Sequence, residues 1–147
     1  MIKKIAIWFL CLSVLFGQFS MAEEKFLSLK KSKVNVRYGP SFDSKIKYIY
    51  KKINLPIKQI DQKENFRRIV DLKNNSGWIH ISQIKKSNSI IILEDKILYK
   101  KPSNFSKPIA KLEKGRLLIL KKCENIWCKV KTEDYSGWVK TENIWGS

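Results

Sequence analysis

The residues that could do chemistry in this chain are few, and they do not form a catalytic pattern. His80 is the only histidine, and beyond the N-terminal segment the chain has two cysteines, Cys123 and Cys128. Neither cysteine is a plausible partner for His80 as nucleophile and base, and the scattered carboxylates nominate no general acid or base. A glycine-rich phosphate loop is also missing. The sequence therefore predicts a protein that is not an enzyme, with no catalytic residues and no cofactor.

Cys123 and Cys128 have four residues between them, a length typical of a hairpin loop. In an oxidising compartment, two cysteines that face each other across a hairpin are expected to form a disulfide. In the chain-entropy model a ring this short stabilises the fold by about 2 kcal/mol. Free thiols are the alternative. Zinc requires four ligands, more than these cysteines and His80 can supply, so no metal site is predicted.

The N-terminus indicates the compartment. Lys3 and Lys4 precede an apolar run at residues 5–16, and Ser20 and Ala22 stand three residues before and directly before a candidate cleavage position. This pattern predicts a secretory signal peptide over residues 1–22, cleaved near Ala22. An uncleaved anchor is the alternative, although the run is short for a membrane span. We expect an exported protein, periplasmic or secreted, with no transmembrane span in the mature chain.

The chain is strongly basic, with a formal net charge of +17. Removal of residues 1–22 takes away two lysines and no acid, which leaves +15. Such a charge favours an anionic partner, for instance a membrane surface or an anionic wall polymer. However, only four of the thirty basic residues are arginine, so drift in base composition toward lysine codons is an equal alternative. Export makes nucleic acid an unexpected partner.

Beyond residue 22 the apolar residues alternate over short runs that are separated by turn residues, a pattern typical of an all-β domain. Residues 34–38 (VNVRY), 57–60 (IKQI), 66–70 (FRRIV) and 78–81 (WIHI) all read as strands. The pattern then repeats, because the Gly77-Trp78 pair returns 60 positions later as Gly137-Trp138. A repeat with near-constant spacing indicates two homologous units. We expect them over residues 26–86 and 89–147, packed closely because the linker is short.

Four short motifs of the first unit are NVRYGPS at residues 35–41, NLPI at 54–57, NFRRI at 65–69 and SGWIH at 76–80. They resemble, in this order, the N-x-R-x-G-P-S opening, the G-L-P-V step, the N-W-R-R-I run and the closing G-W-V-H of bacterial SH3 (SH3b-like) domains. Residues 127–130, 137–139 and 144–146 resemble the second repeat of exported tandem SH3 proteins, whereas residues 97–102 lack its opening motif. The resemblance implies two tandem small SH3-like β-barrels after an N-terminal signal peptide helix.

Three local interpretations accompany this fold. Asn54 stands where the family usually has glycine, and asparagine tolerates the left-handed conformation better than other residues with a side chain. Gly77 and Gly137 are expected at tight turns, where glycine reaches positive φ without steric cost. His80 is expected to be structural, since it belongs to the closing strand motif.

SH3-like barrels often expose an aromatic groove that takes extended peptides. The candidate ligand-binding residues are Arg37, Tyr38, Tyr48, Tyr50 and Arg67, whereas Phe66, Trp78, Trp127 and Trp138 are expected to be mainly structural. The resemblance implies recognition of cell-wall peptidoglycan or its stem peptides, whose carboxylates suit a basic surface. The alternative is a periplasmic scaffold that docks another envelope protein or peptide, with incidental charge. A third reading is electrostatic attachment to anionic lipid or lipopolysaccharide.

Overall fold

The computed structural model describes residues 25–146, so the predicted signal peptide at residues 1–22 lies outside the described part of the chain. Within residues 25–146 the chain consists of strands and turns, and its only helical element is a 3₁₀ turn, η1 (Ile81–Gln83). None of the helices in this described range is long and apolar enough to cross a bilayer. The predicted all-β fold class is confirmed.

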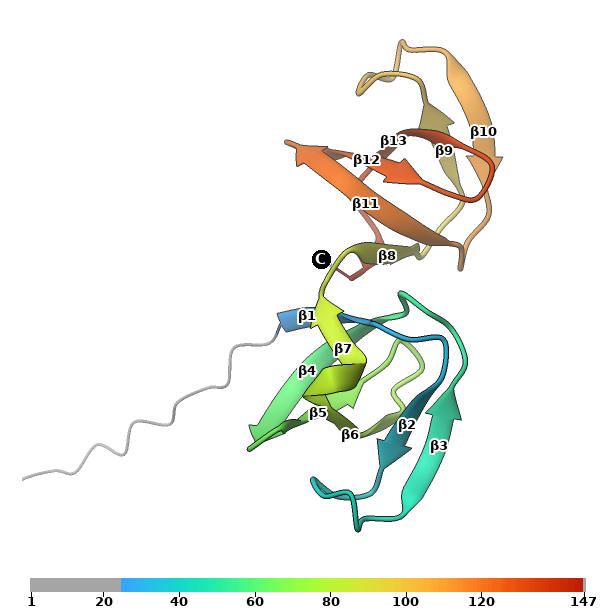
Figure 1. The fold of residues 1–147 in the computed structure, drawn as a ribbon. Coiled ribbons are helices and arrows are strands. Elements are labelled where there is room, and N and C mark those ends of the chain that lie inside the picture. Colours follow the sequence, from blue (N-terminus) through green and yellow to red (C-terminus); the bar gives the residue numbers. More distant parts are fainter. Residues whose placement is uncertain (1–24, 147) are drawn as a thin grey trace, which may run out of the picture.

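The first unit is a seven-stranded antiparallel sheet that curls into a small barrel (Figure 1). Its strands are β1 (Lys25–Leu29), β2 (Val34–Arg37), β3 (Ile46–Tyr50), β4 (Pro56–Lys63), β5 (Phe66–Val70), β6 (Ser76–His80) and β7 (Ile84–Lys86). In space they run β3-β2-β6-β5-β4-β1-β7.

The second unit repeats this arrangement strand for strand. Its strands are β8 (Ser89–Ile92), β9 (Lys96–Tyr99), β10 (Pro108–Leu112), β11 (Leu117–Glu124), β12 (Trp127–Lys131), β13 (Ser136–Lys140) and β14 (Ile144–Trp145). Their spatial order is β10-β9-β13-β12-β11-β8-β14, the order of the first sheet with every label raised by seven. The predicted pair of tandem SH3-like barrels is therefore confirmed.

Each barrel has its own core, formed by the inward-facing residues that alternate along its strands. The first core contains Leu27, Leu29, Val34, Val36, Ile57, Ile69 and Ile79. The second contains Ile90, Ile92, Leu98, Leu112, Leu118, Cys128, Val130 and Val139. In both barrels the long hairpin that carries the core shifts register once, between Gln59 and Asp61 and between Leu120 and Lys122. Such irregularities bend a strand and help a small sheet to close.

Cys123 and Cys128 are paired directly across the β11–β12 hairpin and are joined by a disulfide, with their Cα atoms 4.0 Å apart. Cys128 belongs to the second core, whereas Cys123 is exposed. The predicted disulfide is therefore confirmed.

The interpretation of Gly77 and Gly137 as positive-φ turn residues is wrong. Both glycines lie inside strands, and neither is among the residues with positive φ. Glycine is required there for space, because a Cβ at Gly77 would lie 2.4 Å from Val36 Cγ1 and one at Gly137 would lie 2.6 Å from the Tyr99 carbonyl oxygen. Asn54, in contrast, does adopt the left-handed conformation, with φ of 61°.

The two barrels are joined by specific contacts. The buried hydroxyls of Ser28 and Ser89 are 2.8 Å apart, and Ser89 also donates to the Asn54 carbonyl. At the end of the chain Trp145 donates from Nε1 to the Pro56 carbonyl at 3.1 Å, and its ring meets Phe26 edge-on at 5.0 Å. These contacts hold the barrels in a defined relation, with β8 against the first barrel (Figure 1).

Candidate functional site

The outer face of the first barrel carries two neighbouring rows of side chains on β2, β6 and β5. In one row Phe66 lies directly opposite His80, and in the other Arg68 lies opposite Trp78. Arg37 on β2 extends the second row, since it is also paired with Trp78. Residues two apart on a strand share a face and are separated by about 7 Å. We call this surface, formed by residues 37, 66, 68, 78 and 80 together with the ring of Phe42 that packs on it, the platform.

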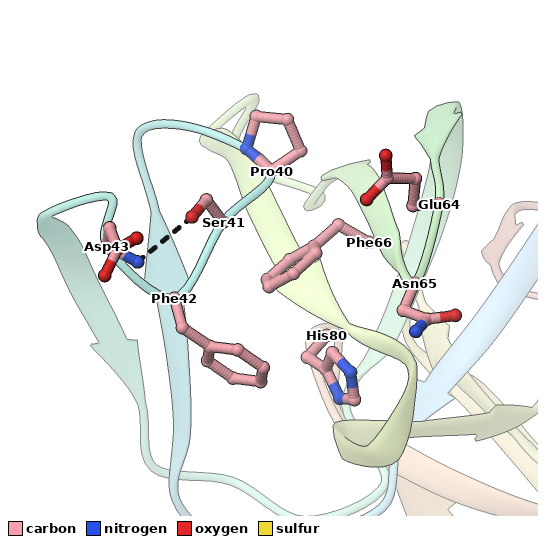
Figure 2. A pocket seen from close by; sticks show the side chains of 8 residues that line it. All are labelled: Pro40, Ser41, Phe42, Asp43, Glu64, Asn65, Phe66 and His80. Carbon is pink, nitrogen blue, oxygen red and sulfur yellow. Dashed lines mark hydrogen bonds between the residues drawn. The ribbon is translucent and has the colours of Figure 1, made fainter.

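The aromatic row is completed by a third ring from the loop between β2 and β3 (Figure 2). Phe42 packs against Phe66 with ring centroids 5.2 Å apart and against His80 at 4.9 Å, while Phe66 and His80 are themselves 5.2 Å apart. Phe66 is buried in this cluster, whereas Phe42 remains 64% exposed. The Phe42 ring is thus open to water on one side and packed on two other rings on the other, so it is available to contact a ligand.

A cleft of about 380 Å³ lies over these rings, and its rim is acidic. Asp43 and Glu64 stand on either side of it, with Asn65 at one end (Figure 2). In a chain with a net charge of +17, two carboxylates beside open aromatic faces form an unusual local environment. Aromatic faces and carboxylates together suit an amine or another cationic group.

Arg37 fixes the loop that presents Phe42. Its Nη1 donates to the carbonyl oxygen of Phe42 at 3.1 Å and to that of Ser44 at 2.9 Å, and its guanidinium lies 5.5 Å from the centre of the Phe42 ring. Both bonds use Nη1, so among the described residues Nε and Nη2 retain free donors. Arg37 can therefore shape the loop and still contact a ligand.

The second row borders a basic cleft of about 280 Å³ on the other side of the loop. It is lined by Arg37, Tyr38, Lys47, Arg68, Ser76, Gly77 and Trp78. Lys47 donates from Nζ to the Ser76 carbonyl at 2.9 Å and lies 5.6 Å from the centre of the Tyr38 ring. Three cations around two aromatic side chains suit a carboxylate or a similar anion.

The imidazole of His80 already has a local role. Its Nδ1 caps the start of η1 by accepting a hydrogen bond from the backbone nitrogen of Ser82 at 3.2 Å. The same Nδ1 lies 2.8 Å from the Ser82 hydroxyl. Within residues 25–146 no group of three His, Cys, Asp or Glu side chains could hold a metal ion. The geometry thus assigns His80 to the aromatic platform and to the start of the 3₁₀ turn.

The structure separates the five residues that the sequence nominates for ligand binding. Arg37 and Tyr38 line the basic cleft, and Tyr38 is 66% exposed. Arg67 points to the opposite face of β5 from Arg68, where it donates to the carbonyls of Glu64 and Phe66. Arg67 therefore lies outside the platform, and any ligand that it binds contacts a different surface.

Tyr48 and Tyr50 pack against the first core and bond to each other. Their hydroxyls are 3.2 Å apart, and the Tyr50 hydroxyl donates to Asp71 Oδ2 at 2.9 Å. Burial raises the pKa of both phenols, and for Tyr50 the neighbouring Tyr48 and the Asp71 carboxylate raise the pKa further. Both side chains therefore stay neutral hydrogen-bonding groups at physiological pH, lateral to the platform.

Phe42 and Lys47 are site residues that the sequence did not reveal. One signal was available, since Phe42 directly follows the Gly-Pro-Ser turn, where a large apolar residue has no core to fill. Lys47 is one of many lysines and gives no such signal. Trp78 was expected to be mainly structural, yet it is only half-buried and lines the basic cleft.

The second barrel does not repeat the platform. At the position of His80 it has Lys140, paired with Trp127, and at the position of Arg37 it has Tyr99, paired with Trp138. Lysine ammoniums already cover both indoles, Lys140 at 5.8 Å from the Trp127 centroid and Lys122 at 5.4 Å from that of Trp138. Both indoles are less than 9% exposed, and the exposed rings of the second barrel, Phe105 and Tyr135, lie outside these paired rows. The row of three packed rings at residues 42, 66 and 80 therefore has no counterpart among the described residues of the second barrel.

Comparisons with known proteins identify one family and two solved structures to which this chain is similar. The bacterial SH3 domain family matches residues 30–86 and again residues 95–146. Two solved structures are similar, NlpC2 and NlpC1 from Trichomonas vaginalis, each 10% identical with a TM-score of 0.37. They cover 82% and 85% of this chain, which spans 47% and 46% of theirs, less than half in each case. No curated protein is significantly similar in sequence. With two family matches that together take in most of its length, the chain belongs to the bacterial SH3 domain family.

Proposed function

We propose that this chain is an exported, non-catalytic binding protein that recognises the stem peptides of peptidoglycan through the platform of its first barrel. Members of its family are often cell-wall binding modules. The observation that carries the proposal is the pair of clefts of opposite charge on either side of the loop at residues 38–45.

A stem peptide is a short extended peptide with free carboxylates, small aliphatic side chains and, commonly, a diamino acid. Its carboxylate would bind at Arg37, Lys47 and Arg68 in the basic cleft. Its ammonium would lie over the rings of Phe42 and Phe66, between Asp43 and Glu64. The two rows are about 7 Å apart, which matches two residues of extended peptide.

The experiment is retention of residues 23–147 on purified peptidoglycan at about 50 mM and about 300 mM salt. Phe42→Ala and Arg68→Gln each remove one part of the platform from an exposed position. The matched controls are Asn104→Ala and Lys129→Gln, which occupy the corresponding places in the second barrel. Retention at high salt that falls by about tenfold in the first pair, and stays unchanged in the second, supports the proposal.

Three other outcomes would favour a different mode of binding or a different site. Loss of all binding at about 300 mM salt in the unaltered protein would indicate charge alone. Absence of binding at both salt concentrations would favour the alternative of a protein partner in the envelope. Equal losses of retention in the platform variants and in their controls would show that the first barrel is not the binding site.

Export is part of the proposal and has its own test. Expression with the full N-terminus should release a protein whose mass and first residue correspond to cleavage after Ala22. A product that keeps residues 1–22 would contradict export by a cleaved signal.

A further inference from the structure

A cleft of about 770 Å³ lies at the join between the barrels and is larger than either cleft of the platform. One wall comes from the first barrel, from Ser32 and the connection between β3 and β4 at residues 51–54. The other comes from the second barrel, from the start of β11 and the end of β12. This second wall is formed by Arg116, Leu117, Ile119, Lys121, Lys131, Thr132 and Glu133. The cleft therefore requires both units.

Aliphatic side chains are left partly open in this cleft. Ile53, in the connection after β3, is 49% exposed, and Leu117 and Ile119 on β11 are half-buried. Apolar surface of this kind gains about 25 cal/mol for each Å² that a ligand removes from water. The cleft is thus able to bind an apolar group as well as a charged one.

The charges around the cleft are predominantly positive. Five cations line it, Lys51, Lys52, Arg116, Lys121 and Lys131, against the single carboxylate of Glu133. Arg116 has a distant partner in Asp134, at 3.9 Å. Among the described residues, no carboxylate lies within 4.0 Å of the four lysine ammoniums.

The walls are held in place before any ligand arrives. The backbone carbonyl of Asn54, at the edge of the cleft, accepts a hydrogen bond from the Ser89 hydroxyl. The same hydroxyl lies 2.8 Å from the Ser28 hydroxyl. The pairing of Leu117 with Ile91 ties the other wall to β8, which starts at the join. A preformed site avoids much of the ordering cost of binding.

We propose that this cleft between the barrels binds an acidic peptide segment that carries aliphatic side chains. A single phosphate group is best held by convergent donors such as an arginine fork. Here the cations are mostly lysines, spread along both walls, which suits several separated carboxylates on an extended chain. The aliphatic floor suits the side chains between them, and a volume of about 770 Å³ lies in the range of sites that enclose a small ligand.

The test measures binding of the whole chain, residues 23–147, to a fluorescein-labelled peptide Glu-Leu-Glu-Val-Glu-Leu by fluorescence anisotropy. The peptide Gln-Leu-Gln-Val-Gln-Leu is the uncharged control. Lys52→Gln, Lys121→Gln and Lys131→Gln are combined in one variant. The matched variant combines Lys73→Gln, Lys101→Gln and Lys107→Gln, which remove the same charge from exposed positions outside the cleft.

We expect the acidic peptide to bind, the amide peptide to bind at least about tenfold more weakly, and the cleft variant to lose about tenfold in affinity. The matched variant should lose less than about threefold. Ile53→Asp, at an exposed position, should weaken binding while leaving the far-ultraviolet circular dichroism unchanged. Equal losses in the two lysine variants would overturn the proposal, because they would show attraction by net charge alone.

A second probe separates the peptide from an anionic membrane. The proposal would also be overturned if phosphatidylglycerol vesicles bind the unaltered chain but not the cleft variant, and the acidic peptide does not bind the chain at all. The cleft variant should keep its retention on peptidoglycan, because the platform is untouched. Failure of the platform proposal and failure of this one are thereby distinguishable.

Discussion

Trp145, in the last strand, donates a hydrogen bond from Nε1 to the carbonyl oxygen of Pro56, the first residue of β4, at 3.1 Å. The two residues are 89 positions apart and belong to different barrels. Gly146 continues the contact, since a Cβ there would lie 2.9 Å from Pro56 Cβ and 2.6 Å from the Ser89 carbonyl oxygen. Trp145 and Gly146 thus pack the last strand of the second barrel against the first barrel.

Trp145→Phe keeps an aromatic ring beside Phe26 but removes the hydrogen bond. Because it leaves the Pro56 carbonyl without its partner, we expect a loss of about 1–2 kcal/mol in the free energy of unfolding. Urea unfolding followed by circular dichroism measures it, with Trp78→Phe, away from the join, as the control. If Trp145→Phe lowers the free energy of unfolding no more than Trp78→Phe does, the hydrogen bond to Pro56 does not couple the barrels.

Arg37→Lys tests whether Arg37 acts through geometry or through charge. Lysine keeps the positive charge but cannot make the two carbonyl bonds to the loop with the same planar group. We expect faster amide hydrogen exchange in residues 38–45 and a loss of peptidoglycan retention similar to that of Phe42→Ala. Retention equal to that of the unaltered protein would mean that charge alone suffices at this position.

Removal of the disulfide by Cys123→Ala together with Cys128→Ala should destabilise the chain by about 2 kcal/mol, from the entropy of a closed ring of six residues. Cys128 is buried in the second core, so the substitution also removes packing there. Reduction of the unaltered protein with dithiothreitol separates the two effects, because it opens the ring without removing the sulfur atoms. An unfolding midpoint that reduction leaves unchanged would contradict the expected contribution.

The sequence predicted the fold well because barrel formation depends on patterns that repeat along the chain. The alternation of apolar residues indicated an all-β chain and the return of the Gly-Trp pair indicated two units, while the resemblance to bacterial SH3 domains implied that each unit is a barrel. The spacing of Cys123 and Cys128, together with the predicted export, indicated their disulfide. The left-handed conformation of Asn54 could be predicted because it depends on the local backbone and on the residue type. These features are encoded over a few residues each.

The site was harder to predict because its features arise from contacts between distant segments. Gly77 is a glycine because Val36, on another strand, approaches it closely. Both faces of β3 carry apolar or aromatic residues, so the sequence could not show that Tyr48 and Tyr50 turn toward the core. Phe42 enters the platform only because Arg37 folds the loop back, a contact that no local pattern shows.

Gly137→Ala should destabilise the second barrel by about 1–3 kcal/mol, the usual cost of overpacking. The added Cβ would lie 2.6 Å from the Tyr99 carbonyl, a backbone atom that cannot move without shifting β9. Gly39→Ala is the control, because its Cβ would meet the Ser44 hydroxyl, at the end of a side chain that can rotate. Urea midpoints measure both, and an equal effect of the two substitutions would refute the spatial explanation for Gly137.

Asp95 provides a test of pH dependence in the second barrel. Its carboxylate accepts a hydrogen bond from the Lys114 backbone nitrogen at 2.9 Å and lies 3.4 Å from Lys111 Nζ. The Lys114 N–H, and then the Lys111 ammonium, hold the pKa of Asp95 below its ordinary value of 3.8. A carboxyl whose pKa is lower in the folded state stabilises the fold above the unfolded pKa, and this stability is lost as pH falls through the folded pKa.

Asp95→Asn keeps an acceptor for the Lys114 nitrogen but removes the charge. We therefore expect the variant to unfold at a lower urea concentration than the unaltered protein at about pH 7, and at nearly the same concentration at about pH 2. Urea titrations at the two pH values measure the difference. A gap between the two proteins that stays constant with pH would show that Asp95 acts through its shape and hydrogen bond and not through its charge.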